Sequence, residues 1–232
     1  MVLYLILTVP ALLFSLYAQW KVSSTYRKYA GVRSGRNVSG TEVARILMRN
    51  EGLMHVGVES VAGDLTDHYD PGAKVIRLSS GSQEPSVAAM AIVAHELGHA
   101  AQDQQGYAWL RVRSGIVPLA NLGSTLGMLL FFGGMLLMSF ANSGLGVSVA
   151  WAGVALMSAA VVFTLVTLPV EFDASNRARA MLQRNGLVTA QEAAGVDAVL
   201  NAAALTYVAA AAQAVSQLLY WVLMLTGMRR EE

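Results

Sequence analysis

The chain has 232 residues, of which 55% are hydrophobic and 13% are charged, and its formal net charge is +1. The charged share is far below the roughly 25% of soluble domains, so the composition favours a membrane protein. A net charge so near zero argues against nucleic acid as a partner, because proteins that bind nucleic acid usually carry an excess of basic residues. The absence of cysteine excludes disulfides, thiolate metal sites and a cysteine nucleophile, so any metal ion must be held by histidine and carboxylate side chains.

Residues 1–20 carry no charge, and the first charged side chain is that of Lys21. An apolar run of about 20 residues is long enough to cross the hydrocarbon core of a bilayer. A cleaved signal peptide has positive charge before its apolar run and small residues at a cleavage site after it, and this segment has neither feature. We predict that residues 1–20 are a retained transmembrane anchor; a buried core helix is the alternative.

Residues 21–113 form the largest polar block of the chain, and we predict a small cytoplasmic α+β region there. Residues 39–53 have apolar side chains at helical spacing, with Ser39 or Thr41 as the cap. A second, longer helix is expected over residues 85–105. Two stretches between these helices alternate like strands, MHVGVESVAG and AKVIRLSS, and the turn-forming stretch DLTDHYDPG separates them.

The longer helix contains the stretch AHELGHAAQ, in which His95 and His99 are four positions apart. Residues at this spacing lie on one face of a helix, about 6 Å apart along its axis, so both imidazoles can converge on one metal ion. Glu96 is rotated by about 100° from His95, which leaves its carboxylate to act as the general base on a water at the metal. Gly98 is expected to let another backbone or a substrate approach closely. The spacing therefore predicts a catalytic Zn²⁺ site.

No charged residue occurs between Arg113 and Glu171. This length accommodates two spans of about 20 residues each, and the stretch FANSGLG supplies a turn between them. We predict a transmembrane hairpin over residues 114–170. Three glycines are expected to let neighbouring helices approach closely: Gly127, Gly133 and Gly134.

A catalytic zinc ion needs a third protein ligand. We predict a cytoplasmic helix over residues 171–200, and Glu171 stands at its start, where the hairpin returns the chain to the side of the histidines. The histidine candidates are His55 and His68, and His68 lies in a turn-rich stretch from which it could reach the metal. The residues alone leave Glu171 and His68 as open alternatives.

Residues 201–228 form a further charge-free run, which predicts a transmembrane helix or, alternatively, a helix lying along the interface. Basic residues follow the first span and flank the hairpin on both sides, so this side of the membrane is expected to be cytoplasmic. We therefore expect a multi-pass membrane protein with its active site facing the cytoplasm. Arg229 and Arg230 fit this orientation poorly if the last run crosses the membrane.

Four stretches resemble the bacterial membrane-embedded neutral zinc metallopeptidases of the YugP type: LTDHYDP, VIRLS, AHELGHAAQ and EFDASNRA. The layout is more distantly similar to the HtpX-type membrane metalloproteases, which place two spans between His-Glu-x-x-His and a Glu-x-x-Ala-Asp helix that supplies the third ligand. This resemblance implies Glu171 as that ligand, with Ala174 in the matching position. Ser175 replaces the aspartate that usually orients a ligand histidine, so either Ser175 or Asp173 is expected to take this role.

Several residues near these motifs are further candidates. Arg177 or Arg179 could stabilise an oxyanion, or both could be solvated or contact lipid phosphate. His68, with its acidic neighbours Asp67 and Asp70, could aid catalysis or bind a second ion, although a turn held by Asx hydrogen bonds is the favoured reading. The stretch VIRLS could be an edge strand that receives a peptide by strand addition.

These observations predict a mainly α, polytopic membrane protein with about three to four transmembrane helices and a small α+β, zincin-like cytoplasmic region. The expected activity is that of a gluzincin-like zinc endopeptidase. In it His95, His99 and Glu171 hold Zn²⁺, Glu96 acts as the base, and Arg177 and His68 assist. Its expected partners are the lipid bilayer and a polypeptide substrate, in particular a membrane protein. The alternatives are a non-catalytic, zinc-stabilised membrane scaffold and a zinc hydrolase of a non-peptide amide.

Overall fold

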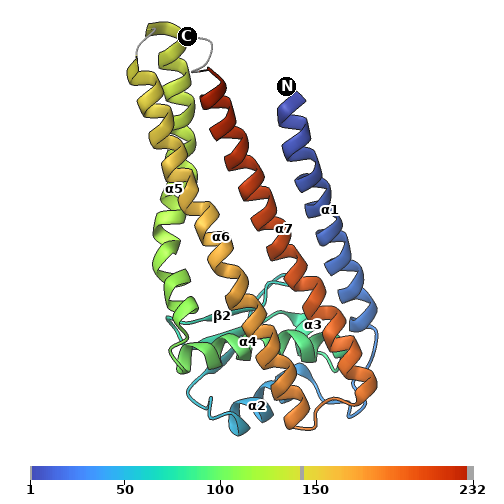
Figure 1. Cartoon of the computed structure of the whole chain (residues 1–232). Coiled ribbons are helices and arrows are strands. Elements are labelled where there is room, and N and C mark those ends of the chain that lie inside the picture. The colour runs from blue at the N-terminus through green and yellow to red at the C-terminus, as the bar shows by residue number, and fades with distance from the viewer. Residues whose placement is uncertain (1, 142–143, 229–232) are drawn as a thin grey trace. The chain divides into compact units, whose positions relative to one another are not determined.

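The computed structural model describes residues 2–141 and 144–228, and this part of the chain is mainly helical (Figure 1). Four of its helices are long and apolar enough to cross a membrane, and three short strands form one sheet. The predicted mainly α fold with about three to four spans is therefore confirmed. The elements are α1 (Val2–Ala30), α2 (Gly40–Asn50), β1 (Gly57–Ser60), β2 (His68–Asp70), β3 (Val75–Leu78), α3 (Ser80–Gln83), α4 (Val87–Gln104), α5 (Ala108–Ala141), α6 (Gly144–Arg184) and α7 (Ala190–Met228).

The long helices continue beyond the apolar runs that predicted them. Helix α6 has 41 residues, which corresponds to about 60 Å, twice the roughly 30 Å of a bilayer core. It contains the second span of the predicted hairpin and also Glu171, so no break separates the apolar part from the polar part. Helix α7 has 39 residues and is among the four candidate spans. Arg229 and Arg230 lie outside the described residues.

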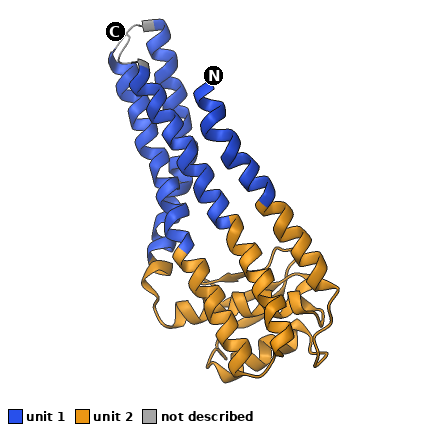
Figure 2. Ribbon diagram, turned by 45° about the vertical axis from the view of Figure 1, so that its right-hand side comes forward, with its two compact units in different colours: residues 1–17, 112–168, 207–232 blue, residues 18–111, 169–206 orange. Residues whose placement is uncertain are grey.

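The chain divides into two compact units, coloured separately in Figure 2. Unit 1 comprises residues 1–17, 112–168 and 207–232, and unit 2 comprises residues 18–111 and 169–206. The boundaries fall inside or at the start of the four long helices.

In unit 1, small residues bring α5 and α6 together. A Cβ atom added to Gly134 would lie 2.4 Å from the backbone nitrogen of Ala150, and one added to Gly127 would lie 2.9 Å from the carbonyl oxygen of Gly153. The close approach predicted for these two glycines is confirmed. The prediction was wrong for Gly133, because a Cβ there meets no atom of the described residues within 4 Å.

In unit 2, the sheet has the strand order β1-β3-β2. Strand β3 pairs parallel with β1 and antiparallel with β2. The expectation that VIRLS is an edge strand was therefore wrong, since β3 is the central strand. Strand β2 lies within the stretch predicted as a turn, because pairing with β3 extends a segment whose local composition favours turns.

The core of unit 2 is formed by helices α2 and α4, the sheet, and parts of α6 and α7. Helix α2 begins with the predicted cap: Ser39 and Glu42 form a reciprocal capping box. Its apolar face contributes Leu47, which is fully buried together with Ile76 of β3 and Leu97 of α4. Met181 and Leu182 of α6 and Leu200 of α7 belong to the same cluster. Segments that are far apart in the sequence therefore share one apolar core in unit 2.

Candidate metal centre

Helix α4 carries the predicted zinc motif and lies within the core of unit 2. It is capped by Ser86, whose side chain accepts a hydrogen bond from the backbone nitrogen of Ala89. Most of its residues are buried, because Ala and Val occupy all its faces in the stretch VAAMAIVA. Three of the motif's side chains are therefore held in a largely dry environment: Glu96, Leu97 and His99 are 7%, 0% and 8% exposed.

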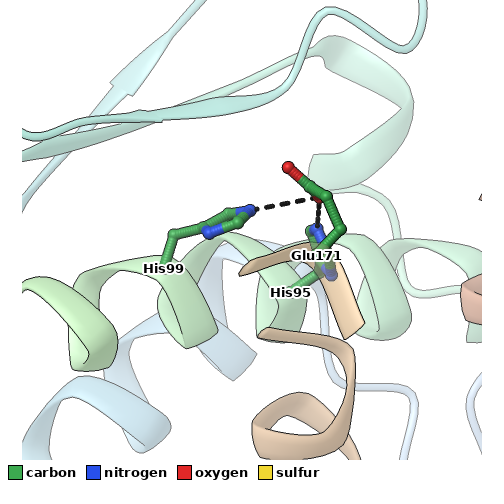
Figure 3. Close-up of side chains that lie close together, drawn as sticks. All are labelled: His95, His99 and Glu171. Carbon is green, nitrogen blue, oxygen red and sulfur yellow. Dashed lines mark hydrogen bonds and ion pairs between the residues drawn. The ribbon is translucent and has the colours of Figure 1, made fainter. Parts of the chain in front are cut away.

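Two histidines of α4 and one glutamate of α6 converge (Figure 3). The Nε2 atoms of His95 and His99 lie 3.2 Å and 3.5 Å from Oε2 of Glu171. Ligand atoms about 2.1 Å from one tetrahedral Zn²⁺ ion are separated by roughly 3.4 Å. All three candidate ligand atoms lie within 4.8 Å of one another, so these residues fit a zinc ion with small adjustments.

The remaining imidazole nitrogens have partners that direct both Nε2 atoms to this point. Nδ1 of His99 lies 3.0 Å from Oε1 of Gln102, and Nδ1 of His95 lies 3.2 Å from Oγ of Ser175. The amide orientation of Gln102 follows from its Nε2 group, which donates to two acceptors. Because Oε1 can only accept, Nδ1 of His99 carries the proton and Nε2 presents its lone pair. Ser175 thus contacts His95, as the resemblance implied for this position.

A close contact between two helices makes this arrangement possible. A Cβ atom added to Gly98 of α4 would lie only 2.5 Å from the carbonyl oxygen of Ala174 of α6. Glycine at this position therefore allows α6 to approach α4, and Ala174 is fully buried in the contact. Glu171 lies one helical turn before Ala174 and is brought to the two histidines in this way. The close backbone approach expected at Gly98 is confirmed.

The charge of Glu171 changes the protonation of its neighbour. Burial lowers the pKa of His99, but the hydrogen bond and the charge of Glu171 outweigh burial and raise the pKa above its ordinary value. Protons and a metal ion therefore compete for Nε2 of His99, and metal binding is expected to weaken as the pH falls.

Glu96 lies beside this cluster but is not part of it. Its side chain is 7% exposed, and it makes no hydrogen bond to any residue that the structure describes. Glu96 is thus a buried carboxylate next to the candidate metal ligands, with no hydrogen-bond partner in the described chain.

The two candidate arginines have different surroundings. Arg179 uses all three of its guanidinium nitrogens, which donate to Asp197, Asn176 and Asn201. Arg177 donates from Nε to Asp173 and from Nη1 to Gln105, and its guanidinium lies 5.8 Å from the ring centroid of Tyr107. Its Nη2 group makes no bond within the described residues. Arg179 therefore joins α6 to α7, and Arg177 keeps one donor available.

His68 lies outside the cluster of possible metal ligands, which contains only His95, His99 and Glu171 among the described residues. It is exposed on strand β2, with Nδ1 2.9 Å from the carbonyl oxygen of Thr66 and Nε2 3.4 Å from Nη1 of Arg77. His55 does not belong to the cluster either.

The acidic neighbours of His68 stabilise the local fold. Asp70 accepts hydrogen bonds from the backbone nitrogens of Gly72 and Ala73, which is the predicted Asx turn. Asp67 accepts from the backbone nitrogen and the hydroxyl of Ser79. Both carboxylates therefore have partners in the turn and at the end of β3.

One residue of the site was missed by the sequence interpretation. Gln102 is fully buried and contacts His99 directly. Its place three residues after His99, on the same face of the helix, was a signal for such a contact. Polar side chains at this spacing also occur without a role, so the contact became visible only in the fold.

The chain is similar to known proteins over nearly its whole length. A family model described as "Putative neutral zinc metallopeptidase" matches residues 4–226. The curated "Putative membrane protease YugP" of Bacillus subtilis (strain 168) is 44% identical over 234 residues, covering 99% of each chain. No solved structure matches the chain. The chain therefore belongs to this family of neutral zinc metallopeptidases, as its four resembling stretches implied.

Proposed function

We propose that this protein is an integral membrane zinc endopeptidase of the gluzincin kind, which hydrolyses peptide bonds of membrane or membrane-proximal polypeptides. The observation that carries the proposal is the convergence of His95, His99 and Glu171 on one point, with Glu96 buried beside them. A structural zinc site would need no carboxylate in that place and would be closed by a fourth protein ligand. The family membership and the similarity to a membrane protease support the same activity.

Each residue of the site has a defined part in this proposal. His95, His99 and Glu171 would hold Zn²⁺, which lowers the pKa of a water and polarises the peptide carbonyl. Glu96 takes the proton of the attacking water and returns it to the leaving amine. Gln102 keeps the imidazole of His99 in the tautomer that presents Nε2, and Ser175 orients the ring of His95 through its contact with Nδ1.

Arg177 and His68 are proposed as assisting residues. Arg177 is favoured over Arg179 because Nη2 of Arg177 remains available to a developing oxyanion, whereas every guanidinium nitrogen of Arg179 is bound. His68 is exposed on β2, at an edge of the sheet, where a bound peptide could meet it.

We further propose that the site faces the cytoplasm at the inner membrane of a bacterium. Apart from Arg113 and the four C-terminal residues, all charged residues of the chain lie in unit 2. Loops rich in Lys and Arg stay on the cytoplasmic side, and Glu171 directly follows the apolar part of α6 in the sequence. This placement favours substrates that are anchored in the membrane or reach its surface.

The experiment that tests the activity compares the detergent-purified chain with Glu96→Gln. Both proteins are brought to equal zinc content, and cleavage of an unfolded polypeptide is measured. We expect the variant to keep its zinc and to lose about 10²–10⁴-fold in rate, the usual contribution of a general base. Equal rates would remove Glu96 from the mechanism, and no cleavage by either zinc-loaded protein would favour the scaffold or an amide hydrolase with another substrate.

The choice of third ligand is tested with a second pair of variants, Glu171→Ala and His68→Ala. We expect the first variant to lose bound zinc and the second to keep it, because Glu171 lies against both histidines and His68 is outside the cluster. The zinc content after dialysis is the measurement. Retention of zinc by Glu171→Ala together with loss by His68→Ala would reverse the assignment.

A further inference from the structure

Gln102 is the one polar residue among the largest fully buried side chains of the described chain. A buried amide is costly unless its hydrogen-bonding groups are satisfied. Its Oε1 atom accepts from Nδ1 of His99 at 3.0 Å, and its Nε2 atom donates to the carbonyl oxygen of Val170 and to Oδ2 of Asp173, both at 2.8 Å. Both amide hydrogens and the oxygen are thus in use, which fixes the orientation of the side chain.

The two acceptors of the Gln102 amide, Val170 and Asp173, lie on either side of Glu171 in the sequence. Val170 precedes Glu171 directly, and Asp173 follows it by two positions in the same turn of α6. Gln102 itself belongs to α4, which carries both histidines. One side chain therefore contacts a ligand histidine on its own helix and holds the turn of the other helix that bears the carboxylate.

A second connection between the same helices supports this one. Oδ2 of Asp173 also accepts from Nε of Arg177 at 2.5 Å, and Nη1 of Arg177 donates to Oε1 of Gln105 at 2.7 Å. The hydrogen bonds run from Gln102 of α4 to Asp173 and Arg177 of α6 and return to Gln105, the C-cap residue of α4. Oδ2 of Asp173 therefore accepts from both the Gln102 amide and the Arg177 guanidinium.

We propose that Gln102 is a positioning residue for the metal: it aims Nε2 of His99 and holds Glu171 at the correct distance, and through both contacts it sets the zinc affinity. This inference rests on the proposed zinc site, although it does not depend on which substrate is cleaved. The contact of Gly98 with Ala174 brings the two helices together, and the Gln102 hydrogen bonds fix their register.

The test compares Gln102→Met with Gln104→Met in the full-length, detergent-purified protein. Methionine has a similar length but cannot replace the three hydrogen bonds. Gln104 is on the same helix, exposed, and donates to the carbonyl oxygen of Gly52, so it provides a matched control. Zinc affinity is measured by competition with a chelator, and thermal unfolding of the zinc-free proteins is measured in parallel.

We expect Gln102→Met to lower zinc affinity about 10–100-fold, the range found for partners of metal-bound histidines, and Gln104→Met to leave it unchanged. Wild-type affinity in Gln102→Met, with or without a lower unfolding temperature, would show that Gln102 only packs the core and would overturn the proposal. An equal loss of affinity in both variants would also overturn it.

A double variant, Gln102→Glu with Asp173→Asn, tests the same contacts by reversing one of them. The new carboxylate can accept from Nδ1 of His99 and from the new amide, whose oxygen still accepts from Arg177. The hydrogen bond to the carbonyl oxygen of Val170 is lost, because a carboxylate cannot donate. We expect zinc affinity within about 10-fold of the wild-type protein, above that of Gln102→Met. If Gln102→Met does not fold, this variant decides alone, and a folded double variant with a 100-fold or greater loss would contradict the proposal.

Failure of the proposal and failure of the proposed function give different results. If the wild-type protein binds zinc and Gln102→Met binds it weakly, the positioning role is established even when no peptide is cleaved. If the wild-type protein does not bind zinc at all, the metal site and the role of Gln102 fail together.

Discussion

Units 1 and 2 hold their helices together by different means. Unit 1 exposes many large apolar side chains, such as Leu129 and Phe132, at 65% and 54%, and Arg113 is its one charged side chain among the described residues. Unit 2 has a core of fully buried Leu, Ile and Met side chains, surrounded by ion pairs. The surface of unit 1 suits lipid and that of unit 2 suits water, so the polar chemistry of the chain is concentrated in one unit.

The two units nevertheless share one packing device. In each, a glycine of one helix lies against the backbone of another helix: Gly134 against Ala150 in unit 1 and Gly98 against Ala174 in unit 2. In unit 1 the contact only brings apolar helices together. In unit 2 it sets the distance between candidate metal ligands, so the same substitution should have different consequences in the two places.

The largest effect is expected for Gly98→Ala. The added Cβ would lie 2.5 Å from the carbonyl oxygen of Ala174, so α4 and α6 must separate and Glu171 must move away from the histidines. We expect a loss of about 1–3 kcal/mol in stability and a fall in zinc affinity of about 10-fold or more. Calorimetry and chelator competition measure the two effects.

The control for this variant is Gly115→Ala, where a Cβ meets nothing within 4 Å. This change is expected to be neutral or to stabilise helix α5 by about 0.5–1 kcal/mol, because alanine favours a helix. Unchanged zinc affinity in Gly98→Ala would mean that the close contact does not set the ligand distance.

A smaller effect, on stability alone, is expected for Gly134→Ala in unit 1. Its Cβ would lie 2.4 Å from the backbone nitrogen of Ala150, whereas that of the neighbouring Gly133→Ala would meet nothing. We expect the first variant to lower the unfolding temperature in detergent or lipid and the second to leave it unchanged. Neither variant should change zinc affinity. A loss of zinc in Gly134→Ala would show that helix packing in unit 1 affects the metal site in unit 2.

The smallest effect is expected at Asp103, which connects α4 to the sheet. Burial raises the pKa of Asp103, but hydrogen bonds from Lys74 and Tyr69 outweigh burial and lower it below the ordinary value. A carboxyl whose pKa is lower in the folded state contributes stability above its unfolded pKa and loses this contribution as the pH falls.

We expect Asp103→Asn to reduce stability at neutral pH by a few tenths to about 1 kcal/mol, because the pair is partly exposed. The difference from the wild-type protein should shrink between about pH 5 and pH 3, where the wild-type carboxyl takes up its proton. Unfolding temperatures of both proteins across this range measure it, and a constant difference would contradict the stated origin.

Local patterns were sufficient for the elements whose signal lies within one segment. The apolar runs predicted the long helices, and Ser39 was one of the two caps predicted for the start of α2. Local patterns failed where strand pairing determines the structure. Strand β2 lies in a turn-forming stretch, and β3 is the central strand because it pairs with both β1 and β2. The strands are short, so hydrogen bonds between them, rather than their composition, define the sheet.

In the candidate metal centre, too, some residues were predicted from a local pattern and others depend on long-range contacts. His95, Glu96 and His99 were found because residues four apart share a helix face, a relation that needs no tertiary information. Glu171 remained one of two alternatives until the resemblance favoured it, and in the structure it lies against both histidines. The contact of Gln102 with His99 is local, whereas its hydrogen bonds to Val170 and Asp173 are long-range.

The sequence by itself determined where apolar runs are long enough to cross a bilayer and which helix carries a metal-binding face, because both follow from the fixed geometry of the α-helix. Only the tertiary structure decided which carboxylate meets the histidines, which side chains orient them and which glycine permits the contact. These features depend on how α4 packs against α6, and a packing contact between segments some 70 residues apart leaves no periodic trace in either segment.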